Sequence, residues 1–321
     1  MATILLLNMG GPSNLAEVRP FLGNLFGDPM ILDLPGGAIL RPLLSRLIPA
    51  VRLRKVQRAY ASIGGGSPLL RLTLRQAAAL RAELATRGHA EVEVEVVMRY
   101  TPPRAAEVLS RLAERGETRA LALPLYPHEC RATTGSSLAE LEALRPRLAP
   151  GLRVETIRSW HLETGYIDVL AARVRAAIDR LPAEARARAV LLFSAHGVPE
   201  ALPRRGDPYV AQVRETVAAV LERLGTGHAW RLGWQSRAGP VKWVGPGTDR
   251  VIAALAGAEA VVVVPVSFVS DHIETLYEID LLFGAQARRA RIRHFVRTAS
   301  LDDDPGFIAV LAGLAAPFLA T

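Results

Sequence analysis

Short, continuous apolar runs recur along this 321-residue chain, and stretches with helical periodicity separate them. Five of these runs are typical of strands buried on both faces: 3–7, 92–98, 120–125, 190–194 and 261–266. Helices are predicted between them, at 70–87, 105–115, 166–181 and 209–224. This alternation predicts an α/β fold in which parallel sheets are covered by helices.

The composition is that of a packed globular protein. Half of the residues are hydrophobic and 22% are charged, which excludes a disordered or fibrous chain. The single cysteine, Cys130, cannot form an internal disulfide. At about 150 residues per domain, the length predicts two domains, and two such sheets fit it.

The net charge of +8 comes from 39 basic and 31 acidic residues, and nearly all of the basic residues are arginines. Nucleic-acid binding would call for a basic stripe interleaved with aromatic residues. Aromatic residues make up 6% of the chain and do not interleave with the arginines, so we expect no nucleic-acid partner. A positive surface would instead favour the approach of an anionic small molecule or an anionic membrane face.

We expect no export signal, because residues 1–7 lack a basic segment and lead into a Gly-Gly-Pro turn. No run of about 18 apolar residues occurs, so no membrane-spanning helix is expected. We therefore expect a cytoplasmic protein.

Residues 21–53 break the alternation of strands and helices. The segment is rich in leucine, isoleucine and phenylalanine, but prolines at 20, 29, 35, 42 and 49 interrupt it. It is too broken for one helix and too apolar for an ordinary loop. Two interpretations stay open, an irregular cap on the core and a lip over an apolar pocket. In the second, four arginines would face lipid headgroups: Arg41, Arg46, Arg52 and Arg54.

Ligands of open parallel sheets bind beyond the carboxyl ends of the strands. His196 directly follows one predicted strand, and Gly197 would let the chain turn sharply there. Other strand ends are followed by 235–236 and 267–268. A lone histidine is more often structural than functional. Residues 194–197 lack the flanking glycines of a G-x-S-x-G elbow, which argues against a serine hydrolase.

Segment 271–280 concentrates four carboxylates and a histidine: Asp271, His272, Glu274, Glu278 and Asp280. Asp271 and Glu274 have the spacing of a capping box, and a solvated acidic face is a second structural interpretation. Asp271, Glu274 and Glu278 would share one face of a helix. In a pocket, grouped carboxylates would raise one another's pKa and take up protons. A histidine and a glutamate from separate strand ends could also hold a divalent metal and leave coordination positions open.

A series of short motifs follows in order along nearly the whole chain: LNMGGP at 7–12, IGGGSP at 63–68, RY at 99–100, YP at 126–127, TTGSS at 133–137, FSAHGVP at 193–199, GDPY at 206–209, WQS at 234–236 and SDHIETLYE at 270–278. Together they resemble the motifs of the ferrochelatase family, enzymes that insert ferrous iron into a porphyrin in the last step of haem synthesis. Residues 194–196 and 270–278 are the most specific part of the resemblance.

The resemblance implies two Rossmann-like domains with the porphyrin in the cleft between them. The first would comprise residues 1–171 together with 305–321, since the family's last helix packs back on it, and the second would comprise 172–304. The family's invariant histidine falls on His196 and its essential glutamate on Glu274. Both are implied as catalytic and metal-binding residues.

Further site residues are implied by the same motifs. Four match positions in the family's porphyrin pocket: Met9, Arg99, Tyr100 and Trp234. Three match a supporting polar network: Asp271, His272 and Glu278. Arg99 is a candidate partner for a porphyrin propionate, and a salt bridge at the edge of the core is the structural alternative.

Segment 21–53 matches the family's active-site lips, which can associate with a membrane. The resemblance therefore favours the lip over the irregular cap and adds a peripheral location on the inner membrane face to the expectation. Some family members hold an iron–sulfur cluster on four cysteines. Cys130 cannot supply four thiolates, so we expect no cluster and no permanently bound cofactor.

The implied reaction inserts Fe2+ into protoporphyrin IX, giving protohaem and two protons. A cleft that prefers the bent ring over the flat one would favour the transition state. His196 would approach the pyrrole nitrogens or ligate iron, and Glu274 with its acidic neighbours would pass protons outward. Coproporphyrin III ferrochelatase, or another tetrapyrrole metal chelatase, is the nearest alternative. A non-catalytic porphyrin or haem carrier is a further alternative, which the acid-rich segment 271–280 disfavours.

Overall fold

Two compact units make up the chain in the computed structural model. The backbone is described for residues 2–31, 37–225, 227–237, 239 and 241–320, and side chains for the same residues except 37–42. The first unit comprises Met1–Ser159 and Asp302–Thr321, and the second comprises Trp160–Leu301. Each contains a four-stranded sheet in which all strands are parallel. The predicted α/β class, with two parallel sheets flanked by helices, is confirmed.

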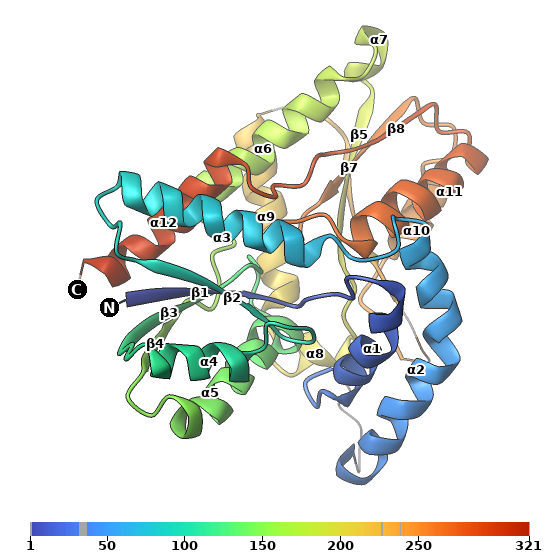
Figure 1. Cartoon of the computed structure of the whole chain (residues 1–321). Helices are drawn as coiled ribbons and strands as arrows, with labels where there is room; N and C mark the ends of the chain where they lie inside the picture. Colours follow the sequence, from blue (N-terminus) through green and yellow to red (C-terminus); the bar gives the residue numbers. More distant parts are fainter. Residues whose placement is uncertain (1, 32–36, 226, 238, 240, 321) are drawn as a thin grey trace. The chain divides into compact units, whose positions relative to one another are not determined.

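The sheet of the first unit has the strand order β2-β1-β3-β4 (Figure 1). Its strands are β1 (Ala2–Asn8), β2 (Glu93–Met98), β3 (Arg119–Pro124) and β4 (Arg153–Thr156). Within β1, Leu5 pairs with Glu95 of β2 on one side and with Ala122 of β3 on the other. Residues 4–7 are fully buried, which is why this stretch of sequence is a continuous apolar run.

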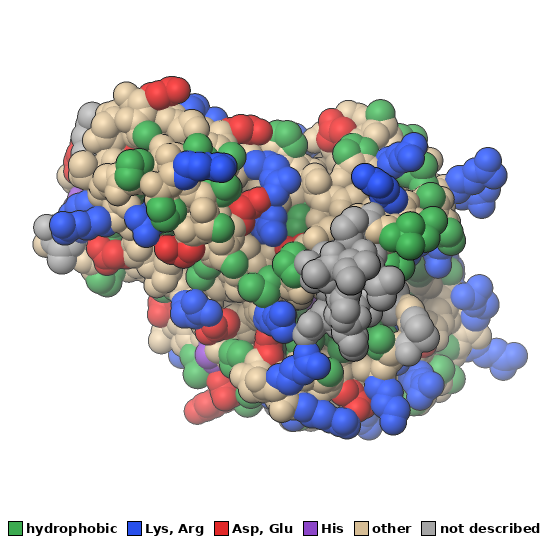
Figure 2. All heavy atoms as spheres, turned by 90° about the horizontal axis from the view of Figure 1, so that it is seen from below, with side chains coloured by type: hydrophobic (Ala, Val, Ile, Leu, Met, Phe, Trp, Pro, Cys, Tyr) green, Lys and Arg blue, Asp and Glu red, His purple; other side chains and the backbone are tan. Residues whose placement is uncertain are grey.

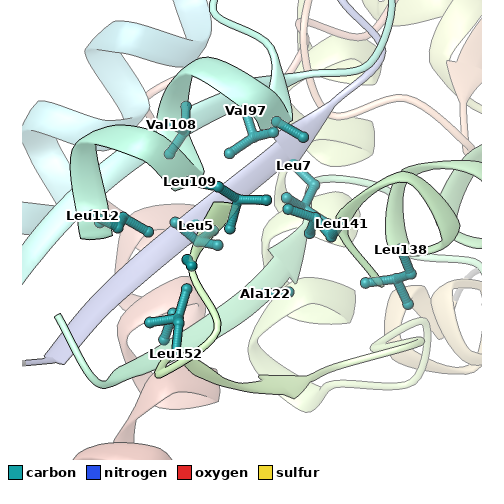
Figure 3. Packing of buried hydrophobic residues seen from close by; sticks show 13 residues of the cluster. Leu5, Leu7, Val97, Val108, Leu109, Leu112, Ala122, Leu138, Leu141 and Leu152 are labelled. Atoms are coloured by element: carbon teal, nitrogen blue, oxygen red, sulfur yellow. The ribbon is translucent and has the colours of Figure 1, made fainter. Parts of the chain in front are cut away.

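The helices of this unit are α1 (Val18–Gly27), α2 (Gly37–Ala61), α3 (Leu69–Thr86), α4 (Ala105–Glu114), α5 (Ser136–Leu148) and α12 (Pro305–Leu319). Of these, α3, α4, α5 and α12 cover the two faces of the sheet, and α1 and α2 pack against each other. Leucines of α4 and α5, among them Leu109 and Leu141, pack on Leu5 and Leu7 (Figure 3). On the other face, α3 and α12 pack against each other and against the strands (Figure 1). A π turn (Arg131–Gly135) leads directly into α5.

The second unit repeats this architecture with the strand order β6-β5-β7-β8. Its strands are β5 (Ala189–His196), β6 (Trp230–Gln235), β7 (Ala260–Pro265) and β8 (His294–Arg297). Its helices are α6 (Thr164–Asp179), α7 (Ala183–Arg186), α8 (Ala201–Arg204), α9 (Tyr209–Leu224), α10 (Thr248–Ala254), α11 (Gly284–Arg289) and a π-helix (Glu274–Phe283). The π-helix is joined to the core through Ile279, which packs with Leu192 and Val263.

Contacts divide the chain at residues 159 and 160, whereas the boundary predicted from the sequence lies at 171 and 172. The predicted boundary falls inside α6, and α6 packs against α9 and β7 of the second unit. On the other side, the division falls at residues 301 and 302, just before the Asp304 side chain that caps α12.

Segment 21–53 is not one helix, as expected, because α1 ends at Gly27 and α2 begins at Gly37, but Pro42 and Pro49 do not interrupt α2. α2 runs from Gly37 to Ala61 with Pro42 and Pro49 inside it. A proline in a helix interior costs about 3 kcal/mol. A helix of 25 residues keeps most of its other hydrogen bonds, and α2 also packs against α1, so the helix continues. Residues 32–36 of the segment lie outside the described residues.

Basic side chains are scattered over the face shown in Figure 2, with acidic and apolar side chains between them. Several arginines of the first unit form ion pairs with acidic side chains. Arg111 and Arg115 both pair with Glu95, and Arg81 pairs with Glu93. This face therefore differs from a continuous basic stripe.

The buried centre of the first sheet makes a testable prediction about stability. Leu7 is fully buried, so Leu7→Ala should lower the free energy of unfolding by about 2–5 kcal/mol, since a cavity adds to the lost burial. The control is Leu74→Ala, which removes an exposed leucine of α3 and should change stability by no more than about 0.5 kcal/mol. Urea denaturation compares the two, and equal losses would contradict the packing described here.

Candidate active site

His196 is the last residue of β5, and its backbone is fixed on both sides. Its N–H donates to the Ser267 hydroxyl at 2.9 Å, and its carbonyl accepts from the Tyr209 hydroxyl at 3.0 Å. In the sheet, His196 lies opposite Gln235 at the end of β6. The rule that ligands gather at the carboxyl ends of parallel strands therefore predicts the neighbours of His196 as well.

Gly197 has a different role from the one predicted, because its φ is not in the left-handed region. Its N–H donates to the Gln235 carbonyl at 2.8 Å, and a Cβ at this position would lie 2.7 Å from the same oxygen. The glycine thus permits close approach of the chain after β5 to the end of β6, rather than a sharp turn.

Glu274 begins the π-helix, and it does not form a capping box with Asp271. The N-cap residue is Ile273, which makes no side-chain capping bond. Instead, the His272 N–H donates to the Thr275 hydroxyl at 3.0 Å, and that hydroxyl lies 2.9 Å from an Asp271 carboxylate oxygen. The Glu274 carboxylate is therefore available to face His196. π-Helices are rare and are frequently found at functional sites.

The central contact joins His196 Nδ1 to Glu274 Oε2 at 2.9 Å. The His196 side chain is 40% exposed and the Glu274 side chain 19%, so the pair is open to an incoming ligand.

The Nε2 atom of His272 lies 3.6 Å from the same Glu274 oxygen. His272 Nδ1 lies 3.0 Å from the Ser270 carbonyl, which assigns a proton to Nδ1. The Phe268 ring contacts both imidazoles, with centroids 6.4 Å from His196 and 4.6 Å from His272.

Glu278 lies one turn further along the π-helix and is held from β6. Its Oε2 atom accepts from Gln235 Nε2 at 2.9 Å and from the Ser236 hydroxyl. Gln235 Nε2 also donates to the Glu274 carbonyl at 2.9 Å, while Gln235 Oε1 accepts from the Ser194 hydroxyl at 2.7 Å. Ser236 has a φ of 62°, a left-handed conformation that non-glycine residues rarely adopt. A buried amide thus connects β5, β6 and the π-helix.

The two glutamates differ in their affinity for protons. Burial opposes ionisation of Glu274, but His196 and His272 outweigh it and hold the pKa of Glu274 well below its usual range. Burial and the charge of Glu274 raise the pKa of Glu278, against the hydrogen bonds from Ser236 and Gln235. Two neighbouring carboxylates whose pKa values are pushed apart can divide the tasks of charge and proton carrier between them.

His196 gains proton affinity from the same arrangement. Burial alone would lower the pKa of its imidazole, but the charge and hydrogen bond of Glu274 outweigh burial, with a further contribution from Glu278. The pKa of His196 therefore lies above 6.5.

Asp271 is held by groups around the start of the π-helix rather than by His196. Its Oδ1 atom accepts from Ser300 at 2.6 Å and from Arg297 at 2.9 Å. Burial would raise its pKa, but Arg297 and the two hydroxyls of Ser300 and Thr275 lower it. The structure therefore brings His196, His272, Glu274 and Glu278 together, and Asp271 anchors the segment that carries three of them.

In the first unit, Met9 and Arg99 follow the ends of β1 and β2. The Arg99 guanidinium donates to Asp28 at 3.0 Å, to Glu140 at 3.0 Å and to Ser136 at 2.7 Å. Asp28 is buried, and its hydrogen bonds with Ser136 and Tyr100 and the charge of Arg99 lower its pKa despite burial. Three of the five donors of Arg99 are thus used in a salt-bridge network at the edge of the core, the structural alternative of the sequence analysis.

Tyr100 and Trp234, the aromatic residues expected in a porphyrin pocket, are each only 1% exposed. Tyr100 donates its hydroxyl proton to Asp28 at 2.7 Å, and Trp234 packs on Tyr209 with ring centroids 6.0 Å apart. Arg99 and Asp28 also line a cavity of about 310 Å³ that is bounded by Ala139, Ala143 and Leu144 of α5. The two aromatic side chains belong to the packed interior of their units.

No role was predicted from the sequence for five residues that support the site: Tyr209, Gln235, Ser236, Phe268 and Arg297. Three of them, Gln235, Ser236 and Phe268, lie at or just after strand ends, so the rule that identified His196 also points to them. Nothing in the sequence indicated that Arg297 reaches the π-helix.

Among the described residues, no group of three or more His, Cys, Asp and Glu side chains has an arrangement suited to a metal ion. Among the helices described, none is both long enough and apolar enough to cross a bilayer.

Comparison with solved structures places the fold among the chelatases. The multi-domain protein DR2241 of Deinococcus radiodurans, which has structural similarity to chelatases, matches with a TM-score of 0.56 and 19% identity. The match covers 98% of this chain and 55% of that protein, so this chain spans about half its length. SirB from Bacillus subtilis with Fe3+ matches with a TM-score of 0.56 and 12% identity, over 97% of this chain and 93% of that one. At these identities the likeness shows a shared fold.

Comparison of sequences identifies the family. The ferrochelatase family model matches residues 2–317. The ferrochelatase of Synechococcus elongatus is 42% identical over 97% of this chain and 81% of its own length, and that of Geotalea uraniireducens is 42% identical over 97% and 96%. This chain belongs to the ferrochelatase family. It is an enzyme of the lyase class that inserts iron into a porphyrin for haem synthesis.

The ion pair predicts how His196 titrates. Because Glu274 raises the pKa of His196, the stability that the pair gives is present while His196 is protonated and Glu274 is ionised, and it is lost as pH rises through the raised pKa of His196. Glu274→Gln removes the negative charge and should lower the pKa of His196, since burial then opposes the imidazolium. An NMR titration of the histidine ring protons in the metal-free protein measures this shift.

The matched control is Glu215→Gln, which removes the partner of another histidine, His161, 2.7 Å away in the same unit. It should leave the titration of His196 unchanged. An unchanged pKa of His196 in Glu274→Gln would contradict the coupling of the pair.

Proposed function

We propose that the chain inserts Fe2+ into protoporphyrin IX to give protohaem, and that His196 and Glu274 are the catalytic residues. The observation that carries this proposal is the 2.9 Å contact between the end of β5 and the first residue of the π-helix. It places a base and a charged carboxylate together in a partly open position. Iron enters as substrate, and no resident cofactor is part of the proposal.

The contact sets the proton chemistry of His196. With the Nδ1 proton held by Glu274, a neutral His196 presents Nε2 as its basic nitrogen. When Nε2 takes a pyrrole proton, the resulting imidazolium stays paired with the ionised Glu274. Glu278, whose pKa is raised, is the next group able to accept a proton. In this proposal His196 removes protons, Glu274 stabilises positive charge and Glu278 passes protons onward.

The roles of Met9, Arg99, Tyr100 and Trp234 in porphyrin binding stay predictions. Arg99 keeps two guanidinium N–H groups beyond its three bonds to Asp28, Glu140 and Ser136, and these are the donors that a propionate would need. The preference for protoporphyrin IX over coproporphyrin III depends on such donors, because coproporphyrin carries four carboxylates instead of two.

An absorbance assay tests substrate and mechanism together. Purified protein with Fe2+ or Zn2+ should metallate protoporphyrin IX faster than coproporphyrin III; the reverse order would establish the alternative substrate. His196→Ala should lower kcat by about 10²–10⁴-fold, the usual contribution of a general base, with porphyrin binding largely unchanged. Binding is followed by porphyrin fluorescence.

The control is His228→Ala, the same substitution in the loop before β6, and it should keep wild-type kcat. Normal turnover in His196→Ala would remove this residue from the mechanism. Porphyrin binding without metal insertion by the wild-type protein would establish the carrier function instead.

We also propose that α2 makes the peripheral membrane contact of the lip. Three exposed apolar side chains, Leu43, Leu47 and Val51, are spaced four residues apart and so share one face of the helix. Val51 is 84% exposed, far more than a packed surface would leave it. Arg46 and Arg54 are exposed on the same helix, where they suit anionic headgroups. Arg52 lies over the Phe26 ring, and the side chain of Arg41 lies outside the described residues.

Vesicle co-sedimentation tests this contact. The protein should bind vesicles with anionic lipid more than neutral ones, and the triple variant Leu43→Ser, Leu47→Ser, Val51→Ser should lose most of the binding. Leu74→Ser, which removes an exposed leucine from α3, is the control and should bind like the wild type. Equal binding by the triple variant would contradict a role for this face.

A further inference from the structure

Arg297, the last residue of β8, contacts the π-helix segment at two points. Its Nε and Nη2 atoms donate to the two carboxylate oxygens of Asp280, at 2.8 and 3.0 Å. Its Nη1 atom donates to Asp271 Oδ1 at 2.9 Å. Asp271 precedes the π-helix and Asp280 lies in its second half, so Glu274 and Glu278 fall between the two anchored positions.

We infer that Arg297 is a positioning residue for metal insertion, which holds the π-helix in the register that aims Glu274 at His196 and Glu278 at Gln235. The inference rests on the proposed function of His196 and Glu274. Arg297 itself contacts neither glutamate in the contacts described, so its effect passes through Asp271 and Asp280.

Arg297, together with Asp271 and Asp280, forms a clamp on the π-helix segment, and the burial and shape of its guanidinium suit this role. The Arg297 side chain is 12% exposed and Asp271 26%, so their ion pair is partly shielded from water and salt, whereas the Asp280 side chain is 37% exposed. A guanidinium is planar, and two parallel N–H groups match one carboxylate, which fixes direction as well as distance. Ser300 also donates to Asp271, at 2.6 Å, and thereby fixes the second anchor.

Packing alone holds this segment weakly, which is why a polar clamp matters here. Thr275 and Ile279 are the buried residues of the π-helix, whereas Leu281 and Leu282 are exposed. π-Helical hydrogen bonds run from i to i+5, and this winding is rare compared with the α-helix. If the segment returned to α-helical winding, the side chains between Asp271 and Asp280 would point in other directions. The rigid guanidinium of Arg297 could then no longer bind both carboxylates.

The opposite side of the same turns is held by Gln235 and Ser236, which bind Glu278 and the Glu274 carbonyl from β6. The π-helix is therefore anchored from both edge strands of the sheet, since β6 and β8 are its outer strands. Loss of the β8 anchor should leave the catalytic groups present but less well aimed. A misplacement of about 1 Å can reduce a rate by about 100-fold.

The test compares Arg297→Met and Arg297→Lys with Arg293→Met. Arg293 is a matched control, because it borders the same cavity of about 420 Å³ and pairs at 3.0 Å with Glu259, outside the π-helix. Arg297→Met should lower kcat about 10- to 100-fold with KM for porphyrin within about twofold, as expected for misaimed groups. Arg297→Lys should recover part of kcat, and Arg293→Met should match the wild type.

Hydrogen exchange gives a readout that does not depend on activity. Amides of 274–283 should exchange faster in Arg297→Met than in the wild type, while those of β5 and β7 should not change. Wild-type exchange and wild-type kcat in Arg297→Met would overturn the inference, and so would a lower Tm with kcat unchanged. If Arg297→Met does not fold, Arg297→Lys and Asp280→Asn decide the question by the same measurements.

The two proposals fail in different ways. A wild-type protein without chelatase activity would overturn the proposed function. An active wild type together with fully active Arg297 variants would overturn the clamp alone.

Discussion

The contact between His196 and Glu274 sets the requirements that the rest of the second unit meets. It joins residues 78 positions apart in the chain. It therefore exists only because the fold brings the π-helix to the carboxyl end of β5. Burial removes part of the water around both side chains. The attraction between the two offsets the cost of that desolvation. The backbone of His196 is fixed by Ser267 and Tyr209, which leaves its ring as the part that can respond to a ligand.

The central strands could be predicted from sequence because burial on both faces demands a continuous apolar run, as at 4–7 in β1 and 261–264 in β7. The edge strands β4 and β8 could not, because their residues are half-buried or exposed and carry polar side chains. His196 could be identified from its place at a strand end. Its partner Glu274 depended on the resemblance to a family, since the spacing from Asp271 fits a helix cap equally well.

Three features of the structure follow from tertiary contacts that sequence spacing does not encode. The π-helix at 274–283 has the apolar content of an ordinary amphipathic helix, and its winding depends on anchors from other strands. The salt bridges of Arg99 require Asp28 and Glu140, which are distant in sequence. The continuity of α2 through Pro42 and Pro49 depends on its length and on packing against α1. In each case these tertiary contacts outweigh the local conformational preference of the sequence.

The two units share two local features, a π segment after an inner strand and an arginine that binds two carboxylates. In each, a π segment follows the strand next to the central one, after β3 and after β7. In each, one arginine binds two carboxylates. Arg99 binds Asp28 and Glu140, which lie outside the π turn, and Arg297 binds Asp271 and Asp280, of which Asp280 lies within the π-helix. In the second unit Asp280 lies within the π-helix, so the Arg297 ion pair adds a tertiary contact to this rare winding. The π segment at 131–135 carries no carboxylate, whereas the one at 274–283 carries Glu274 and Glu278, the residues to which the proposed function assigns charge stabilisation and proton transfer.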